Sequence, residues 1–236
     1  MEIQYFESLP STNETAKAAA MQGASHLFTV VASRQTAGRG RMGRSFASPT
    51  GGTYFSTVLR PRIPRSAYGV ITPFCAVAVH RAVRELAGVT LDIKWVNDLL
   101  HDGKKVCGIL AEAGTDRSGV PFVVLGIGIN TGHAPLPPEL REIAASLPFD
   151  DREALVRHIL AHLARLDEEL ERGTWQTYYR ANASCLGARV QVIAHGISKV
   201  ATALDVDVTG GLLVAYDDGT TETLTGGEIS LRRATQ

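Results

Sequence analysis

Glycines alternate with arginines between residues 37 and 52, which read AGRGRMGRSFASPTGG. Three glycines have the G-x-G-x-x-G spacing of a dinucleotide-binding turn, in which bare backbone approaches a phosphate: Gly38, Gly40 and Gly43. Three arginines stand between and beside them: Arg39, Arg41 and Arg44. This glycine–arginine loop (residues 37–52) therefore combines close backbone approach with positive charge.

The segment after the glycines excludes a dinucleotide turn. Such a turn opens a helix, and an acidic residue stands about 20 positions further on. Here Pro49 and two further glycines lead instead into an aromatic and β-branched run, and the later position offers Arg60 and Arg62. A basic surface loop is the remaining simple interpretation if the segment stands alone.

Three other segments extend the pattern. KWVND (94–98) and GKKVCGILAE (103–112) contribute Lys94, Lys104 and Lys105, and GIGIN (126–130) closes an apolar run with Asn130. Together with the loop they supply cations, backbone amides and backbone that a ligand can approach closely. That combination favours an anionic ligand with more than one negative group.

The composition excludes several classes of protein. The 236 residues contain 24 Lys plus Arg and 24 Asp plus Glu, so bulk charge indicates no nucleic-acid or acidic-membrane partner. The N-terminal MEIQYFESLP lacks a secretory pattern. No apolar stretch approaches the length of about 18 residues that a membrane span needs. Three widely spaced cysteines fit buried thiols in a cytoplasmic protein: Cys75, Cys107 and Cys185.

Periodicity and turn residues predict the elements around these motifs. Helices are expected at 11–23, with a Ser11/Glu14 capping box, at 71–88, and as one long helix at 151–173. Strands are expected at 27–33, 52–60 and 119–130, the last of them central because it is apolar throughout. Residues 89–113 read as a hairpin that turns at Asp102–Gly103.

The sequence pattern changes after Leu186, where short strand-like segments alternate with Gly-Gly and Asp-Asp-Gly turns. We expect an α+β fold with a mixed or antiparallel sheet flanked by helices (1–184), followed by a small SH3-like β-barrel (185–236) with its boundary near Ser184.

The motifs, in this order and spacing, resemble the signature of biotin–protein ligases. STN (11–13), RQTAGRG (34–40) and the closing GGEISLR (226–232) also match, so the resemblance covers nearly the whole chain. Phe46 and Val96 stand where the family usually has Trp and Pro. Bifunctional members carry a DNA-binding domain before STN, and only ten residues precede it here. The chain therefore resembles the monofunctional class, and no DNA partner is expected.

The resemblance implies a two-step reaction. Biotin and ATP, with Mg²⁺, give biotinyl-5′-AMP and pyrophosphate, and the adenylate then acylates one lysine of a biotin carboxyl carrier protein domain. Related folds in lipoate or octanoate ligases and transferases are the alternative, as is a binding module that senses biotin or a nucleotide without turnover. An exposed edge strand of the sheet would allow two copies to pair as a homodimer.

The resemblance also assigns residues. The biotin set is Ser11, Thr12, Asn13, Gln35, Gly38, Arg39, Gly40, Arg41, Lys94 and Gly108. The nucleotide set is Arg41, Arg44, Phe46, Asn97, Lys105 and Asn130. Asp98 is a candidate Mg²⁺ ligand, with a plain Asn97–Asp98 turn as the alternative, and Ser11 has the alternative role of helix cap.

Physical chemistry explains why the first step needs cations. It brings a carboxylate against a triphosphate, and two like charges 4 Å apart repel by about 4 kcal/mol at an effective dielectric constant of 20. Four cations are the expected catalytic groups: Arg39, Arg41, Lys94 and Lys105. No enzyme nucleophile is required, because the substrates attack each other.

Overall fold

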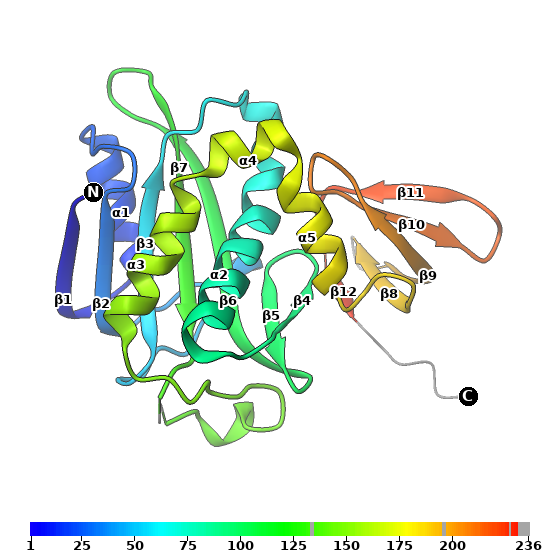
Figure 1. Cartoon of the computed structure of the whole chain (residues 1–236), viewed down its shortest axis with the longest axis horizontal. Helices are drawn as coiled ribbons and strands as arrows, with labels where there is room; N and C mark the ends of the chain where they lie inside the picture. Colours follow the sequence, from blue (N-terminus) through cyan, green and yellow to red (C-terminus); the bar gives the residue numbers. More distant parts are fainter. Residues whose placement is uncertain (133–134, 195–196, 227, 231–236) are drawn as a thin grey trace.

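The computed structural model describes residues 1–132, 135–194, 197–226 and 228–230. Its larger sheet has seven strands in the order β1-β2-β3-β7-β6-β5-β4 (Figure 1). The strands are β1 (Ile3–Leu9), β2 (Thr29–Gln35), β3 (Thr53–Leu59), β4 (Asp92–Lys94), β5 (Asp98–His101), β6 (Lys104–Thr115) and β7 (Pro121–Ile129). Only β1 and β2 run parallel; every other neighbouring pair in this sheet is antiparallel.

Helices cover both faces of this sheet. They are α1 (Thr12–Met21), α2 (Ile71–Ala87), α3 (Arg152–Leu163), α4 (Leu166–Arg172) and α5 (Thr174–Asn182). The main core packs α2 and α3 against one face (Figure 1). A smaller cluster joins α1 to the other face through Ala16, Val58 and Val124. The sheet therefore separates two apolar layers, and the candidate site lies on the α1 side.

Most predicted elements are confirmed. The helix at 71–88 is α2, which ends at Gly88 with φ +65°. The predicted turn is confirmed between β5 and β6, where Asp102 and Gly103 both have positive φ, as a type I′ turn requires, but the expected first arm is two antiparallel strands, β4 and β5. β7 is the fourth of the seven strands and is buried almost throughout, so its central position is confirmed.

Two predictions about helices are wrong. The expected helix at 151–173 is two helices, α3 and α4, separated at Ala164 and Arg165. Three acids fill the first turn of α4, where the helix dipole favours negative charge, so the sequence does contain a second helix start: Asp167, Glu168 and Glu169. The capping box does not form, because Ser11 makes no side-chain cap and Glu14 pairs with Arg39 instead.

Two elements were not predicted at all, β1 and α5. Only three of the seven residues of β1 are apolar (IQYFESL), and Tyr5 is half exposed, because the strand lies at the sheet edge. α5 follows α4 through Gly173, which sequence reasoning treated as the end of helical structure.

The C-terminal part is a five-stranded antiparallel sheet in the order β11-β10-β9-β8-β12. Its strands are β8 (Arg189–Ala194), β9 (Ile197–Val206), β10 (Leu212–Tyr216), β11 (Thr221–Leu224) and β12 (Glu228–Ser230). The α+β fold class is thereby confirmed. Of the GGEISLR motif, Gly227, Leu231 and Arg232 lie outside the described residues.

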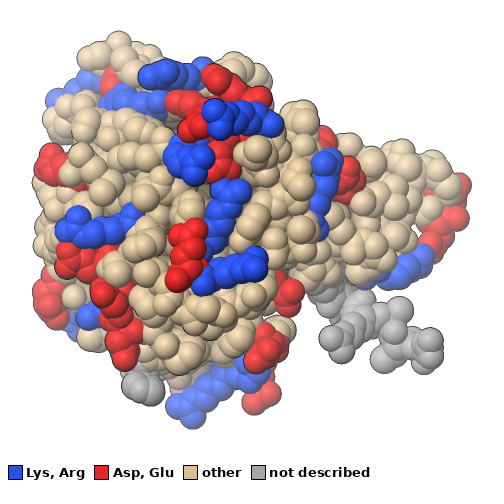
Figure 2. All heavy atoms as spheres, in the orientation of Figure 1, with Lys and Arg blue, Asp and Glu red and all other residues tan. Residues whose placement is uncertain are grey.

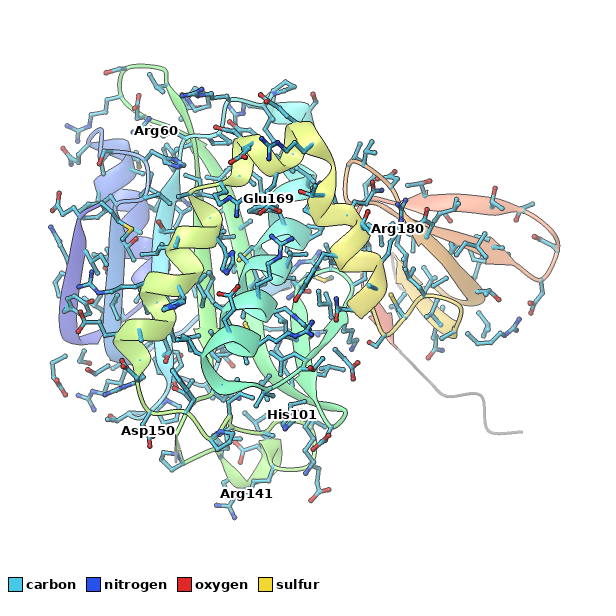
Figure 3. All side chains as sticks on the ribbon, in the orientation of Figure 1. Arg60, His101, Arg141, Asp150, Glu169 and Arg180 are labelled. Carbon is cyan, nitrogen blue, oxygen red and sulfur yellow. The ribbon has the colours of Figure 1, made fainter. Side chains whose placement is uncertain are left out.

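The two parts meet through α5 and the end of β4 (Figure 1). Trp95 Nε1 donates to the Gly210 carbonyl at 2.9 Å, and Gln176 Nε2 donates to the Val206 carbonyl at 2.7 Å. Arg180, seen beside the junction in Figure 3, forms two hydrogen bonds to Asp205. Buried residues of the small sheet belong to the same apolar cluster as α2.

Charge is distributed without a dominant sign. On the face seen in Figure 2, acidic and basic side chains are intermingled over the larger part. Within the described ranges, no helix has the length and apolar character to cross a membrane.

Candidate active site

A cavity of about 150 Å³ lies between the glycine–arginine loop and the α1-side face of β6 and β7. Of the predicted site residues, these line it: Ser11, Thr12, Asn13, Gln35, Arg39, Gly40, Arg41, Arg44, Phe46, Lys94, Asn97, Asp98, Lys105 and Gly108. Lining residues that were not singled out are Met42, Ser45, Trp95, Ile109, Leu110, Gly126, Ile127 and Gly128. These residues fall inside the quoted motifs, so the motifs had already indicated that they lie near the site.

The floor of the cavity is built from glycines on neighbouring strands. Gly108 of β6 is paired with Gly128 of β7, and a Cβ atom at Gly128 would lie 2.5 Å from the Phe46 ring. A Cβ atom at Gly126 would overlap Asn13 Oδ1. These positions are glycine because side chains from the loop and from α1 rest directly on the strand backbone.

The glycine–arginine loop folds back on itself over this floor. The Gly40 N–H donates to the Arg44 carbonyl at 2.7 Å, and the Phe46 N–H donates to the Gly38 carbonyl at 2.8 Å. Met42 and Gly43 make the reversal with φ of +57° and +75°. Gly38 does not line the cavity; a Cβ there would overlap the Phe46 carbonyl oxygen, so Gly38 lets the loop close.

The cations of the site differ in their partners. Arg39 pairs with Glu14, Lys105 Nζ lies 2.7 Å from Asp98 Oδ1, and Arg41 donates to Asn97 Oδ1 at 3.0 Å. Lys94, the last residue of β4, is half-buried, and among the described residues its side chain forms no hydrogen bond and no ion pair within 4 Å, although Asp98 stands opposite it in the β4–β5 ladder. The structure thus brings the four predicted cations around one cavity, in which the carboxylate opposite Lys94 pairs with Lys105.

The two ends of the floor differ in character. Asn13 rests on Gly126, beside Thr12 and Gln35, so hydrogen-bonding groups gather there. Two positions further along β7, the Phe46 ring rests on Gly128, and Lys105 Nζ lies 5.8 Å from the ring centroid. Because two strand residues span about 6.6 Å, a polar end and a cationic end lie within the length of one small ligand.

Two predicted contacts lie elsewhere or are otherwise engaged. Asn130 does not line the cavity: its side-chain amide donates to the Ala145 carbonyl at 3.1 Å and ties down the segment after β7. Among the described residues that line the cavity, Asp98 is the only acidic one, and Lys105 and Asn97 already contact it. Within the described residues, no group of three His, Cys, Asp or Glu side chains is placed to hold a metal ion.

Further residues, three inside the quoted motifs and one outside them, complete the surroundings. Val96 follows Trp95 through a cis peptide bond. Ser48, Ser56 and Glu112 hydrogen-bond to lining side chains, and sequence reasoning did not single them out. The three cysteines are free and buried, as predicted, and burial raises the pKa of the Cys75 thiol.

The model of the biotin/lipoate A/B protein ligase family matches residues 5–130, and that of the biotin protein ligase C terminal domain matches residues 185–232. The chain belongs to the biotin/lipoate A/B protein ligase family.

Curated relatives agree with this assignment. The bifunctional ligase/repressor BirA of Bacillus subtilis is 36% identical over 230 residues, which cover 91% of this chain and 70% of the relative. The biotin–[acetyl-CoA-carboxylase] ligase of Mycobacterium tuberculosis is 32% identical over 236 residues, which cover 94% of this chain and 86% of the relative.

The fold agrees as well. The biotin protein ligase of Aquifex aeolicus, solved in complex with biotin and ATP, superimposes with a TM-score of 0.83 at 26% identity and covers 99% of both chains. These relatives are biotin ligases, so the lipoate or octanoate alternative is not favoured.

Proposed function

We propose that this chain is an ATP-dependent biotin–protein ligase in which the cavity binds both substrates of adenylation. The observation that carries this assignment is the polarity of the glycine floor: the Asn13 amide rests on Gly126 at one end, and the Phe46 ring and Lys105 rest on Gly128 and Gly108 at the other. Biotin has the matching polarity, with a ureido ring at one end and a carboxylate at the other.

In the first step, the biotin carboxylate attacks the α-phosphate of ATP and pyrophosphate leaves. Two anions must approach, and each like-charge contact costs several kcal/mol, about 4 at 4 Å and a dielectric constant of 20. Lys94 is the group proposed to offset this repulsion, because it lines the cavity and the carboxylate opposite it, Asp98, is paired with Lys105. Lys105 and Arg41 are proposed to bind phosphate oxygens, and Phe46 and Arg44 to contact the nucleotide.

Mg²⁺ is proposed to accompany ATP, held chiefly by the phosphates. Within the described part of the chain, Asp98 is the one carboxylate of the lining and is paired with Lys105, so these residues form no all-protein cage. When bound, the ion neutralises phosphate charge.

In the second step, a lysine amine of a biotin carboxyl carrier protein attacks the acyl carbon, and AMP leaves. The carrier lysine is the nucleophile, so the enzyme has only to orient the adenylate and exclude water. The C-terminal part, 185–236, is proposed to be a separate domain that assists ATP use and carrier docking.

Other proposals concern the cellular compartment and the partners of the protein. Three free, buried thiols favour a reducing compartment, the cytoplasm. Equal numbers of acidic and basic residues favour the absence of a DNA partner, because DNA affinity rests mainly on basic contacts to phosphates. Edge strand β1 would allow two copies to pair as a homodimer.

One assay tests the assignment. Pyrophosphate release is measured with biotin, lipoate or octanoate, with and without a carrier-domain acceptor. Release that depends on biotin, followed by biotin transfer to the acceptor, is expected. Release with lipoate or octanoate instead would assign the alternative substrate, and binding of biotin without any release would assign a sensing module.

A further inference from the structure

A line of hydrogen bonds runs from the cavity to two residues that do not line it, Ser56 and Glu112. Asn13 Nδ2 donates to Glu112 Oε2 at 2.9 Å, and Ser56 Oγ donates to Asn13 Oδ1 at 2.6 Å. Ser56 Oγ also lies 2.8 Å from Thr12 Oγ1. Ser56 is fully buried on β3, whereas the Glu112 side chain on β6 is 25% exposed and has Lys17 at 3.9 Å on its outer side.

The direction of every hydrogen bond in this line follows from Glu112. An ionised carboxylate only accepts, so the NH₂ group of Asn13 must face Glu112 and its Oδ1 must face Ser56. The single hydroxyl proton of Ser56 is then committed to Asn13. Consequently the Thr12 hydroxyl supplies the proton of its 2.8 Å contact with Ser56, and Gln35 Oε1, 3.1 Å from Thr12 Oγ1, is the second acceptor of that proton.

The hydrogen-bond directions of Gln35 are fixed in the same way. Its Oε1 accepts from the Thr12 backbone N–H at 2.8 Å, and its Nε2 donates to Ser48 Oγ at 2.8 Å. An NH₂ group has two protons, so Asn13 and Gln35 each keep one N–H that these bonds do not use. Both residues line the cavity. A ligand atom bound at this end meets donors, and a carbonyl oxygen is the group that accepts from both.

Asn13 has little freedom to escape this arrangement. A Cβ atom at Gly126 would overlap Asn13 Oδ1, so the amide is packed directly on the β7 backbone. Only 4% of Asn13 is exposed. With its position fixed by packing, the remaining choice is which amide atom faces Glu112.

We propose that Glu112 and Ser56 are positioning residues that set the donor pattern of the cavity and thereby select a ring carrying a carbonyl acceptor. This inference rests on the proposed function and names the basis of its ring specificity. A cyclic urea satisfies the unused N–H groups. A dithiolane ring leaves them buried and unpaired, and a site built to hydrogen-bond a ligand rejects analogues that lack the partner group.

The test uses the full chain and two ligands, biotin and its imino analogue. The protonated ring of the analogue carries N–H donors where biotin carries the carbonyl oxygen. Glu112→Gln is the main variant, because a glutamine of nearly the same shape both donates and accepts and leaves the Asn13 amide free to reverse. Affinities for both ligands are measured by calorimetry, and biotin KM and kcat by pyrophosphate release.

We expect Glu112→Gln and Ser56→Ala to weaken biotin binding and raise its KM about tenfold, the effect of leaving one buried group unpaired. The kcat at saturating biotin should stay within about twofold, since neither residue contacts the reacting atoms. In Glu112→Gln, the ratio of affinities for biotin and the imino analogue should fall about tenfold or more, because the wild-type donors reject the analogue and the reversed amide accepts from it.

Two control variants separate positioning from general damage. Lys17→Ala removes the outer charge beside Glu112 but leaves the acceptor, so biotin binding should not change. Thr57→Val removes a buried hydroxyl from the next residue of β3, which bonds to Thr29 and the Phe28 carbonyl and not to the cavity. It should lower the unfolding temperature without changing the affinity ratio.

An unchanged affinity ratio in Glu112→Gln, or an equal effect in Lys17→Ala, would overturn the proposal. Failure of the proposed function gives a different result, because the wild-type protein would then neither bind biotin nor release pyrophosphate with it.

Discussion

The Nζ atom of Lys105 lies 2.7 Å from the Oδ1 atom of Asp98, across the neighbouring strands β6 and β5. Both side chains line the cavity and are only partly exposed, 33% and 21%. Asp98 would otherwise place a negative charge where the substrates bring phosphates. The two residues therefore form a unit in which the ammonium compensates the carboxylate and stays at the proposed phosphate site.

This coupling predicts a non-additive double-mutant cycle. Lys105→Ala removes the cation and exposes the substrates to Asp98, so the KM for ATP should rise at least about tenfold. Adding Asp98→Asn should recover part of the loss, with a coupling of about 1 kcal/mol, inside the range for residues in contact. Pyrophosphate release against ATP concentration measures all four proteins. Strict additivity would show that the ion pair has no role in ATP binding.

The glycine floor gives a second prediction. Gly126→Ala places a Cβ on Asn13 Oδ1, so the amide must move and biotin should bind about a hundredfold more weakly, the effect of losing two or three buried hydrogen bonds. Gly226→Ala is the matched control, because its Cβ would meet nothing within 4 Å. Biotin affinity by calorimetry checks both. Equal affinity in the two variants would mean that Asn13 adapts or does not contact biotin.

The sequence allowed the chemistry of the site to be predicted because its motifs are local. Each motif is a short segment, and 14 of the predicted residues line the cavity in the structure. Gly38 and Asn130 were also in motifs, yet they serve the loop closure and the segment after β7. A motif marks the neighbourhood of a residue and does not give the direction of its side chain.

Contacts between distant segments could not be predicted from the sequence. Ser56 lies 43 residues from Asn13, and Glu112 lies 99 residues from it, so their link to the cavity exists only after the sheet has formed. The break between α3 and α4 was missed for another reason. Apolar spacing continued from Leu163 to Leu166, and it outweighed the acidic start of a new helix.

The glycine–arginine loop should become more resistant to proteolysis when ligand is bound. Its glycines raise its entropy and its arginines repel one another, whereas an anionic ligand neutralises them and closes the loop over the adenylate. Tryptic cleavage within residues 38–48 should slow with biotin and slow further with biotinyl-5′-AMP. Arg117, exposed in the β6–β7 connection, is an internal reference whose cleavage should not change. Parallel changes at both places would reflect global stability rather than the loop.

Ending the chain after Ser184 should leave a folded but slower enzyme. Every described residue that lines the cavity precedes residue 129, so these residues are retained. The cut removes the carbonyl partner of Trp95, which follows Lys94, and uncovers apolar surface, so both the unfolding temperature and the ligation rate should fall. Arg180→Ala, which loses two bonds to Asp205 in the full chain, should give a smaller loss of stability. A truncated protein that biotinylates a carrier at the full-length rate would refute the role given to the C-terminal part.

Lys94 carries the sharpest prediction. As the carboxylate attacks the α-phosphate, negative charge builds on the entering and the phosphoryl oxygens together, and a cation between them is worth more there than in the ground state. Loss of one such group costs about 2.7–4 kcal/mol, or a hundred- to a thousandfold in rate. Lys94→Ala should therefore slow adenylate formation on that scale while the unfolding temperature is retained.

The two half-reactions separate this role from simple binding. Transfer from pre-formed biotinyl-5′-AMP to a carrier no longer joins two anions, so Lys94→Ala should slow it much less than adenylation. Lys94→Arg should restore only part of the adenylation rate, because a planar guanidinium does not reproduce a compact ammonium at the end of β4. Single-turnover measurements of each step decide the matter. If both steps slow equally, Lys94 acts in binding or structure, and the charge that drives adenylation must come from Lys105, Arg41 or the metal.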